Sequence, residues 1–472
     1  MNALNPMDLW YHSPLVTIIL TGLAVLVAEG IRKNSAVVSS FISLAGLVGA
    51  GVLTLLNTGP ERETFGGMMA HGVFGNYFAL VFIVAGILSV IASREYLSRK
   101  SNHRSEYYAL LLFAISGMIL MASGRDLVVL FLGVELMSVP FYVLAGFMRS
   151  KNSSNEAALK YFLLGAFATG FLLYGIALVY GAAGTTKISA MSSSLLNDKV
   201  FLIGTGLIIV ALAFKVAAVP FHMWAPDVYE GAPTTVTGFM ATAGKAAAFA
   251  AITLFFLRGV EFSGTSVSML FAILAAASMI VGNITAIAQN SVKRMLAYSS
   301  IAHAGYILSG VAAGNAEGEA GIMFYLGAYM FMNIGAFTIV GLLEGEGDKG
   351  LQFDDYAGLS IRQPVIAFFM ALFMFSLAGV PPLAGFFGKY YVFLAAVKAD
   401  MTWLAVLGVL TSLVSVYYYL RLVVQMYFRD GDQTSVGPKP VGVLAATAIS
   451  AFMVVLLGVQ PSLILNFIAG LF

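Results

Sequence analysis

A succession of long apolar runs, separated by short polar stretches, is the feature that most limits what this chain can fold into. A helix needs about 20 apolar residues to cross the hydrocarbon core of a bilayer. Only 10% of the 472 residues are charged, whereas a soluble domain carries about 25%, so this chain cannot cover a water-facing surface. We therefore predict an all-α polytopic membrane protein with about fourteen transmembrane helices, at 14–30, 35–57, 74–93, 106–123, 126–148, 155–181, 200–226, 233–258, 265–290, 292–314, 320–343, 363–397, 402–428 and 440–470.

The lysines and arginines between these runs predict the orientation of the chain. Cytoplasmic loops of membrane proteins carry an excess of Lys and Arg. If the N-terminus lies outside, fifteen basic residues fall in inside loops and six in outside loops, so we expect both termini on the outer side. The inside set is Arg32, Lys33, Arg94, Arg99, Lys100, Arg104, Arg149, Lys151, Lys293, Arg294, Lys349, Arg362, Arg421, Arg429 and Lys439, and the outside set is Arg62, Arg125, Lys187, Lys199, Arg258 and Lys398.

The residue types needed for several kinds of chemistry are missing from the sequence. The chain has no cysteine, which excludes disulfides, thiolate metal sites and iron–sulfur ligation within it. It has no phosphate-binding glycine motif before a helix and no metal-ligand cluster. A net charge of +2 without a concentrated basic patch argues against a nucleic-acid partner. We therefore expect no cofactor in this chain and a function in moving protons or cations.

Two internal similarities in the same order predict a duplication. VPFYVLAG (139–146) matches HAGYILSG (303–310) with an offset of 164, and AAVPFHMWA (217–225) matches AGVPPLAGF (378–386) with an offset of 161. Each unit would hold five helices, and an odd number inverts the second copy, as in many transporters. The predicted division is a three-helix segment at 1–105, two five-helix repeats at 106–260 and 261–430, and a C-terminal transmembrane helix at 431–472.

Prolines late in the seventh run (200–226) and in the twelfth run (363–397) predict that both helices are discontinuous. Pro220 lies in the first, and Pro381 and Pro382 lie in the second. Proline removes a backbone donor and breaks the helical ladder, and the freed carbonyls survive in a membrane only where protein or water satisfies them. Such breaks indicate an ion path, although membrane helices also tolerate proline kinks that have no function.

Four ionisable residues deep inside predicted spans are the main candidates for a proton path. Each costs roughly 2.5–3.5 kcal/mol at mid-bilayer on insertion scales. Glu135 lies about nine residues into its run, roughly 14 Å along a helix, and we expect Lys215, beside Pro220, to be its partner. The other two candidates are Lys245, which lies among small residues, and Lys389, which follows the second break. The alternative for Glu135 and Lys215 is a static ion pair that only holds the helices together.

Further candidates carry weaker signals. Lys160 comes a turn or so into its run, where its side chain can equally snorkel to the inside surface. His303 can relay protons near neutral pH, although a lone histidine is more often a hydrogen-bonded packing residue. His222 lies at the first helix break, and Asp227 and Glu230 stand at the inside end of that helix, where they line either a path or a solvated loop.

Long motifs make the chain resemble the antiporter-like membrane subunits of respiratory complex I, and among them most closely the N type. The resemblance covers roughly residues 105–430, and the motifs are GVELMSVPFYVLAGF, EAALKYFLLGAFATGFLLYGIALVYGAAGTT, FKVAAVPFHMWAPDVYEGAP, SVKRMLAYSSIAHAGYILSG, YMFMNIGAFTIV and DDYAGLSIRQPVIAFFMALFMFSLAGVPPLAGFFGKYYVFLAA. It implies fourteen helices with two inverted five-helix units. It also implies that Glu135 tunes Lys215, that Lys245 is a central relay, that Lys389 lies toward the outside and that His303 belongs to the chain of polar groups between them.

The resemblance also implies partners, cofactors and location. The partners would be the other membrane-arm subunits, in the bacterial plasma (inner) membrane, while NADH, FMN, iron–sulfur clusters and quinone would be bound by other subunits. The predicted function is proton translocation coupled to electron transfer from NADH to quinone. An alternative is a subunit of a multisubunit sodium/proton antiporter or membrane-bound hydrogenase of the same architecture, and a third hypothesis is a structural spacer.

Overall fold

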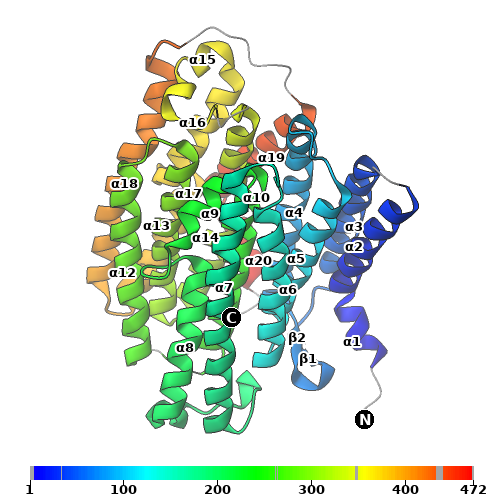
Figure 1. Ribbon diagram of the computed structural model, residues 1–472. Helices are drawn as coiled ribbons and strands as arrows, with labels where there is room; N and C mark the ends of the chain where they lie inside the picture. The colour runs from blue at the N-terminus through cyan, green and yellow to red at the C-terminus, as the bar shows by residue number, and fades with distance from the viewer. Residues whose placement is uncertain are drawn as a thin grey trace.

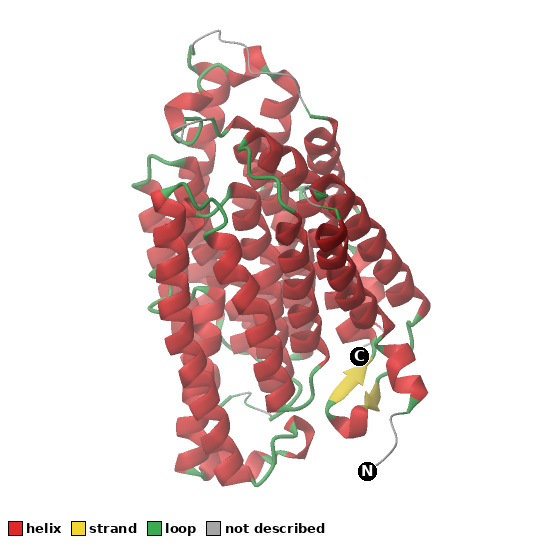
Figure 2. Cartoon of the chain, turned by 45° about the vertical axis from the view of Figure 1, so that its right-hand side comes forward, coloured by secondary structure: helices red, strands yellow, loops and turns green. Residues whose placement is uncertain are grey.

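The computed structural model describes residues 5–32, 35–260, 262, 264–345, 349–431 and 440–469. In this part of the chain long helices lie side by side in one bundle, as Figures 1 and 2 show. A two-stranded antiparallel hairpin, β1 (Arg62–Thr64) and β2 (Met69–His71), caps one end of the bundle near the N-terminus. The predicted all-α membrane architecture is confirmed, apart from this short hairpin.

The helices follow the apolar runs closely. Their bounds are α1 (Pro6–Tyr11), α2 (Ser13–Ile31), α3 (Ala36–Leu56), α4 (Val73–Arg99), α5 (Ser105–Ser123), α6 (Leu127–Ala145), α7 (Asn152–Ala183), α8 (Lys199–Val216), α9 (Trp224–Gly231), α10 (Thr234–Phe239), α11 (Lys245–Phe256), α12 (Ser266–Ile287), α13 (Val292–Ala313), α14 (Ala316–Leu343), α15 (Leu359–Arg362), α16 (Pro364–Ala378), α17 (Ala384–Lys398), α18 (Thr402–Phe428), α19 (Val441–Val459) and α20 (Ser462–Ile468). A π-helical turn, Met240–Gly244, joins α10 to α11.

Twelve helical segments in the described residues are long and apolar enough to cross a membrane. The two other expected spans fall on α13 and on the pair α16 and α17. Helix α13 has 22 residues but is more polar, because it carries two basic residues, a histidine and several serines. Helices α16 and α17 have 15 residues each, which is short for one crossing. The count of fourteen, the inverted repeats and the four-part division therefore stay predictions.

Both helix breaks occur where the sequence predicts them. Helix α8 ends at Ala217, whose φ is +58°, and α16 ends at Gly379, whose φ is +92°, so each helix is terminated by a left-handed residue. These two caps are 162 residues apart, one more than the offset of 161 read from the sequence. By this register the counterpart of Pro220 is Pro382 rather than Pro381, because Pro220 and Pro382 each come three residues after the left-handed cap.

The hairpin end of the bundle is held by ion pairs between distant loops. Glu61 pairs with Arg125 in the α5–α6 turn, with N and O atoms 2.6 Å apart, and with Arg258 after α11 at 3.1 Å. Burial raises the pKa of the Glu61 carboxyl, but the two guanidinium groups outweigh this effect and hold the pKa below its ordinary value. Lys187 donates to the carbonyl of Gly66 at 2.7 Å. These basic residues belong to loops predicted on one side of the membrane.

The opposite end collects loops predicted on the other side. Lys100 and Lys151 both approach Glu344, with N and O atoms 3.7 and 3.9 Å apart. The alternation of loops between two ends therefore agrees with the predicted topology, whereas which end faces outward stays a prediction. Lys33 and Lys439, which belong to the set of basic residues predicted in inside loops, lie outside the described residues.

Helices α5 and α6 approach each other through two glycines. A Cβ atom added at Gly117 would lie 2.4 Å from the backbone nitrogen of Met137, and one added at Gly133 would lie 2.9 Å from the carbonyl oxygen of Gly117. Small residues allow this close backbone approach in membranes. Helix α6 carries Glu135, one of the residues predicted for the proton path.

We expect Gly117→Ala to destabilise the folded subunit by about 1–3 kcal/mol, because the added methyl group has to push two backbones apart. The measurement is the thermal stability of the purified assembly and the amount of the subunit in membranes. Gly170→Ala on α7 is the matched control, because no atom lies within 4 Å of the Cβ that it adds. Equal stability of both variants would contradict the tight α5–α6 contact.

Candidate functional site

Three of the predicted lysines lie buried inside the bundle. Lys215, in the last turn of α8, is 6% exposed, Lys245, the first residue of α11, is 2% exposed, and Lys389 on α17 is 6% exposed. Their burial agrees with the sequence analysis, while their roles stay predictions. Each ammonium group needs polar partners to offset the cost of leaving water. The identity of these partners shows whether a lysine forms an ion pair or is solvated by neutral groups.

Lys215 donates its strongest hydrogen bond to a hydroxyl group of α6. Its Nζ lies 2.6 Å from Ser138 Oγ and 3.4 Å from the hydroxyl of Tyr142. Ser138 Oγ in turn donates to the carbonyl of Val134 at 2.5 Å. The ammonium group also lies 5.6 Å from the centre of the Tyr142 ring, within the range of a cation–π contact.

Glu135 is near Lys215 but does not form the direct ion pair that the sequence suggests. Its Oε1 accepts a hydrogen bond from Thr169 of α7 at 2.8 Å, and the side chain is only partly buried. Ser138 lies three residues further along α6, on the same helix face, and its hydroxyl occupies the position next to the ammonium group. The carboxylate of Glu135 and the ammonium group of Lys215 are therefore not in direct contact, and an effect of one on the other stays a prediction.

Lys245 takes its partners from α13. It follows directly on the π-helical turn Met240–Gly244, a feature that often marks functional sites in helices. Its Nζ donates to the backbone carbonyl of Ser300 at 2.7 Å and to Ser300 Oγ at 2.9 Å. Since no described carboxylate forms an ion pair with Lys245, neutral dipoles solvate its ammonium group.

Other polar side chains of α13, near Ser300, also have hydrogen-bond partners on neighbouring helices. His303, one turn beyond Ser300, bonds through Nδ1 to the hydroxyl of Tyr325 at 2.7 Å and through Nε2 to the hydroxyl of Tyr419 at 3.0 Å. The hydroxyl of Tyr419 is also hydrogen-bonded to Ser299. The buried imidazole is therefore fully partnered and connects α13, α14 and α18.

Lys389 lies at the second helix break. It is the last of the buried polar residues Lys215, Lys245, His303 and Lys389, which we call the buried row. Its Nζ donates to the carbonyls of Leu377 and Ala378, both at 2.9 Å, and to Ser412 Oγ at 2.8 Å. The last carbonyls of a helix have no partner within it, so the break in α16 creates the acceptors that solvate this lysine. The Tyr306 ring centre on α13 lies 5.1 Å from Nζ.

The two matched sequence segments each place a tyrosine beside a buried lysine. Tyr142 and Tyr306 are the tyrosines that coincide in the matched segments. The first faces Lys215 and the second faces Lys389. Each helix break thus has a lysine with an aromatic ring beside it.

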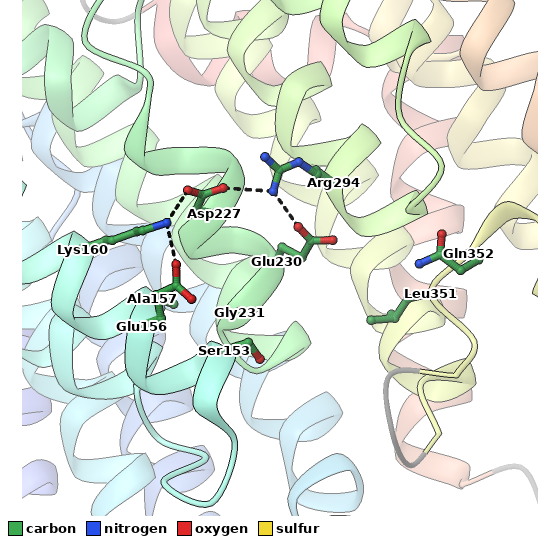
Figure 3. A pocket seen from close by; sticks show the side chains of 10 residues that line it. All are labelled: Ser153, Glu156, Ala157, Lys160, Asp227, Glu230, Gly231, Arg294, Leu351 and Gln352. Carbon is green, nitrogen blue, oxygen red and sulfur yellow. Dashed lines mark hydrogen bonds and ion pairs between the residues drawn. The ribbon is translucent and has the colours of Figure 1, made fainter.

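Lys160 is not part of the buried row. Its side chain is 41% exposed and pairs with Glu156 at 2.7 Å and with Asp227 at 2.8 Å. Figure 3 shows these groups around a cavity of about 360 Å³, where Arg294 pairs with Asp227 and with Glu230. Asp227 and Glu230 therefore line a cavity, and whether they form an entry to a path stays a prediction.

Sequence reasoning missed the neutral members of the site, which are Ser138, Thr169, Ser300, Tyr325 and Tyr419. Ser138 had a usable signal, because it lies three residues after Glu135 on a predicted helix. Tyr325 and Tyr419 had none, since the chain contains 21 tyrosines and no local pattern distinguishes these two. In the described residues no group of three or more His, Asp or Glu side chains is arranged to hold a metal ion.

Known sequences and structures agree with this architecture. A sequence model of the family described as "NADH:quinone oxidoreductase/Mrp antiporter, TM" matches residues 124–415, more than half of the chain. NADH-quinone oxidoreductase subunit N of Trichlorobacter lovleyi is 46% identical over 461 residues, which cover 96% of this chain and 95% of the relative. Subunit N 1 of Chloroherpeton thalassium is also 46% identical, over 96% of both chains.

Solved structures share the fold. A chain of respiratory complex I from Thermus thermophilus with bound aureothin has a TM-score of 0.85 and 36% identity, covering 96% of this chain and 98% of that one. A chain of an archaeal membrane-bound sulfane sulfur reductase has a TM-score of 0.88 at 24% identity, covering 98% and 96%. At that identity the likeness concerns the fold alone. From the family match and the near full-length relatives together, this chain belongs to the subunit N family of the antiporter-like membrane subunits of NADH:quinone oxidoreductase.

Proposed function

We propose that this chain, in the membrane arm of an NADH:quinone oxidoreductase, translocates protons through Glu135, Lys215, Lys245, His303 and Lys389. The observation that carries the proposal is the row of polar side chains on α13. Ser300 binds Lys245, His303 follows one turn later, and the Tyr306 ring lies against Lys389. One helix thus connects two buried lysines with groups that both donate and accept protons.

The proton affinity of Lys215 would be set by the position of Glu135. Two unit charges in a low-dielectric interior interact strongly, and the interaction falls as their separation grows. A movement of α6 against α8 would therefore change how tightly Lys215 holds its proton. The hydroxyl of Ser138 accepts a hydrogen bond from the ammonium group at 2.6 Å and so solvates it without a contact to Glu135.

The remaining steps of the reaction would take place in other subunits. We expect NADH, FMN, iron–sulfur clusters and quinone to be bound there and this chain to hold no redox centre. In the bacterial inner membrane, with both termini outside, the cavity around Lys160, Asp227 and Glu230 would open to the inside and admit protons. Lys160 would then act at the inlet rather than in the buried row.

The alternative assignment to a sodium/proton antiporter or a hydrogenase has less support. A chain of the Mrp complex from Dietzia sp. DQ12-45-1b has a TM-score of 0.84 but 20% identity. The relatives named subunit N reach 46%. The shared fold alone does not favour one of these assemblies, whereas the sequence similarity does.

Co-purification tests the assembly directly. A tag on this chain is expected to retain NADH-oxidising flavin and iron–sulfur subunits in mild detergent, because a membrane-arm subunit is bound to the rest of the enzyme. The measurement is mass spectrometry of the purified assembly together with its NADH oxidation. Recovery of antiporter subunits only, from cells that express both kinds of complex, would contradict the proposal.

Lys215→Ala is expected to abolish or sharply cut proton pumping in the assembled enzyme, because the ammonium group beside Glu135 is lost. The measurement is protons moved per NADH oxidised in sealed vesicles. Lys199→Ala is the matched control, since Lys199 is an exposed residue on the same helix, α8. Normal pumping by Lys215→Ala, or by the neutral double variant Glu135→Gln with Lys215→Met, would instead support a structural spacer.

Tyr419→Phe is expected to lower pumping while the enzyme still assembles. The change removes one hydroxyl and leaves His303 Nε2 and Ser299 without their partner, at a cost of about 1–3 kcal/mol. The same vesicle assay measures the effect. Tyr356→Phe is the control, because its buried hydroxyl has no hydrogen-bond partner among the described residues; an equal loss in both variants would argue against a specific role of Tyr419.

A further inference from the structure

Asn283 of α12 is a buried polar residue that is not part of the buried row. The residue is 1% exposed. Its amide nitrogen donates to the hydroxyl of Tyr306 on α13 at 2.9 Å and to the backbone carbonyl of Met279 at 2.7 Å, and its Oδ1 accepts from the hydroxyl of Tyr418 on α18 at 2.9 Å. Both amide hydrogens therefore have an acceptor. Since the Met279 carbonyl can only accept, it fixes which end of the carboxamide faces Tyr306.

Tyr306 lies between Asn283 and Lys389. Its hydroxyl is bound by Asn283, while Nζ of Lys389 lies 5.1 Å from the centre of its ring. The ammonium group donates its hydrogen bonds to two backbone carbonyls and to Ser412 Oγ, so the tyrosine meets the lysine with its ring and not with its hydroxyl. A tyrosine side chain turns about two bonds. A hydrogen bond at the far end of the ring therefore limits the positions that the ring can take over Lys389.

The matched position in the first half of the chain is apolar. The offset of 164 that aligns Tyr142 with Tyr306 aligns Ile119 of α5 with Asn283. The hydroxyl of Tyr142 accepts a hydrogen bond from its lysine at 3.4 Å, whereas the hydroxyl of Tyr306 is turned to Asn283. Asn283 therefore sets the second tyrosine apart from the first.

We propose that Asn283 is a positioning residue of the proton path, which sets the proton affinity of Lys389 by holding the Tyr306 ring over its ammonium group. The inference rests on the proposed function and deepens it at the second helix break. The face of an aromatic ring attracts an ammonium group but not a neutral amine, so a ring held in this place favours the protonated lysine. Asn283 itself carries no proton along the path, because a carboxamide does not titrate.

The other ionisable groups around Lys389 lie on helices α13, α14 and α18. These three helices pack against α17 together with α16 and α19, which carry no ionisable side chain. The charged residues near the ends of the three helices have partners there, and they are Lys293, Arg294, Glu317, Glu319 and Arg421. The ionisable residues that are buried further along them are His303, Tyr306, Tyr325, Tyr329, Tyr418 and Tyr419. Of the buried set only His303 has an ordinary pKa near neutral pH, and the substitutions that test the proposal leave it in place.

The experiment uses the whole enzyme in sealed vesicles and measures protons moved per NADH oxidised over a range of pH. Asn283→Leu and Tyr306→Phe break the same hydrogen bond from its two sides. We expect each to move the alkaline limb of the pH profile to lower pH by about 0.4–1.5, which is the strength of a cation–π contact expressed in pH. The reason is that an ammonium group without a fixed ring beside it loses its proton more readily. The double variant should move the limb no further, since two changes to one interaction are not additive.

Thr285→Val is the matched control on the same helix. The Thr285 hydroxyl donates to the carbonyl of Val281 within α12 at 2.7 Å, so this variant should keep the pH profile of the wild-type enzyme. A purely structural role of Asn283 would lower the amount of assembled enzyme without moving the pH profile of what assembles, and that result would overturn the proposal. A shift in the double variant equal to the sum of the single shifts would overturn it too.

The outcomes separate this inference from the proposed function. A loss of pumping in Lys215→Ala together with an unchanged pH profile in Asn283→Leu would overturn the positioning role alone. Normal pumping by both Lys215→Ala and Lys389→Ala would overturn both proposals. If Asn283→Leu fails to assemble, Tyr306→Phe decides, because it keeps the ring and removes only the hydroxyl, and an unchanged profile is then sufficient to reject the role of Asn283.

Discussion

An ammonium group inside a membrane has to be met by polar atoms, and this requirement organises the interior of the bundle. Lys215 is solvated by hydroxyls, and Lys245 and Lys389 by hydroxyls and backbone carbonyls, instead of by a carboxylate in contact. Neutral dipoles stabilise a charge without holding it as firmly as a close ion pair does. A lysine solvated in this way can change its protonation state when a charge nearby moves.

The second helix break supplies two of these dipoles. The last carbonyls of a helix have no partner within it, so a helix end offers free acceptors to a neighbouring lysine. The break after Ala378 exposes carbonyls that Lys389 uses, and the break after Val216 places Lys215 at a helix end next to α6. The π-helical turn before Lys245 is a third interruption of regular helix. Irregular backbone is tolerated at membrane depth because protein surrounds it.

Much of the architecture could be predicted because the bilayer restricts the choices. Each apolar run has to become a helix, and a proline late in a run has to interrupt it, so the breaks at Pro220 and Pro382 could be located to within a residue. The burial of Lys245 and Lys389 followed from their position in the runs. Lys160 was ambiguous for the same physical reason, since it lies close enough to a helix end to reach the surface.

The sequence by itself determined which segments become long apolar helices and which lysines are buried among them, because hydrophobic length and the cost of burying charge act locally along the chain. Only the tertiary structure decided what those charges contact. Ser138 rather than Glu135 meets Lys215, and His303 is placed between Tyr325 and Tyr419, residues 22 and 116 positions away. The ion pairs around Glu61 likewise join loops far apart in the chain. Such partners depend on how helices rotate and pack against one another, which no local pattern encodes.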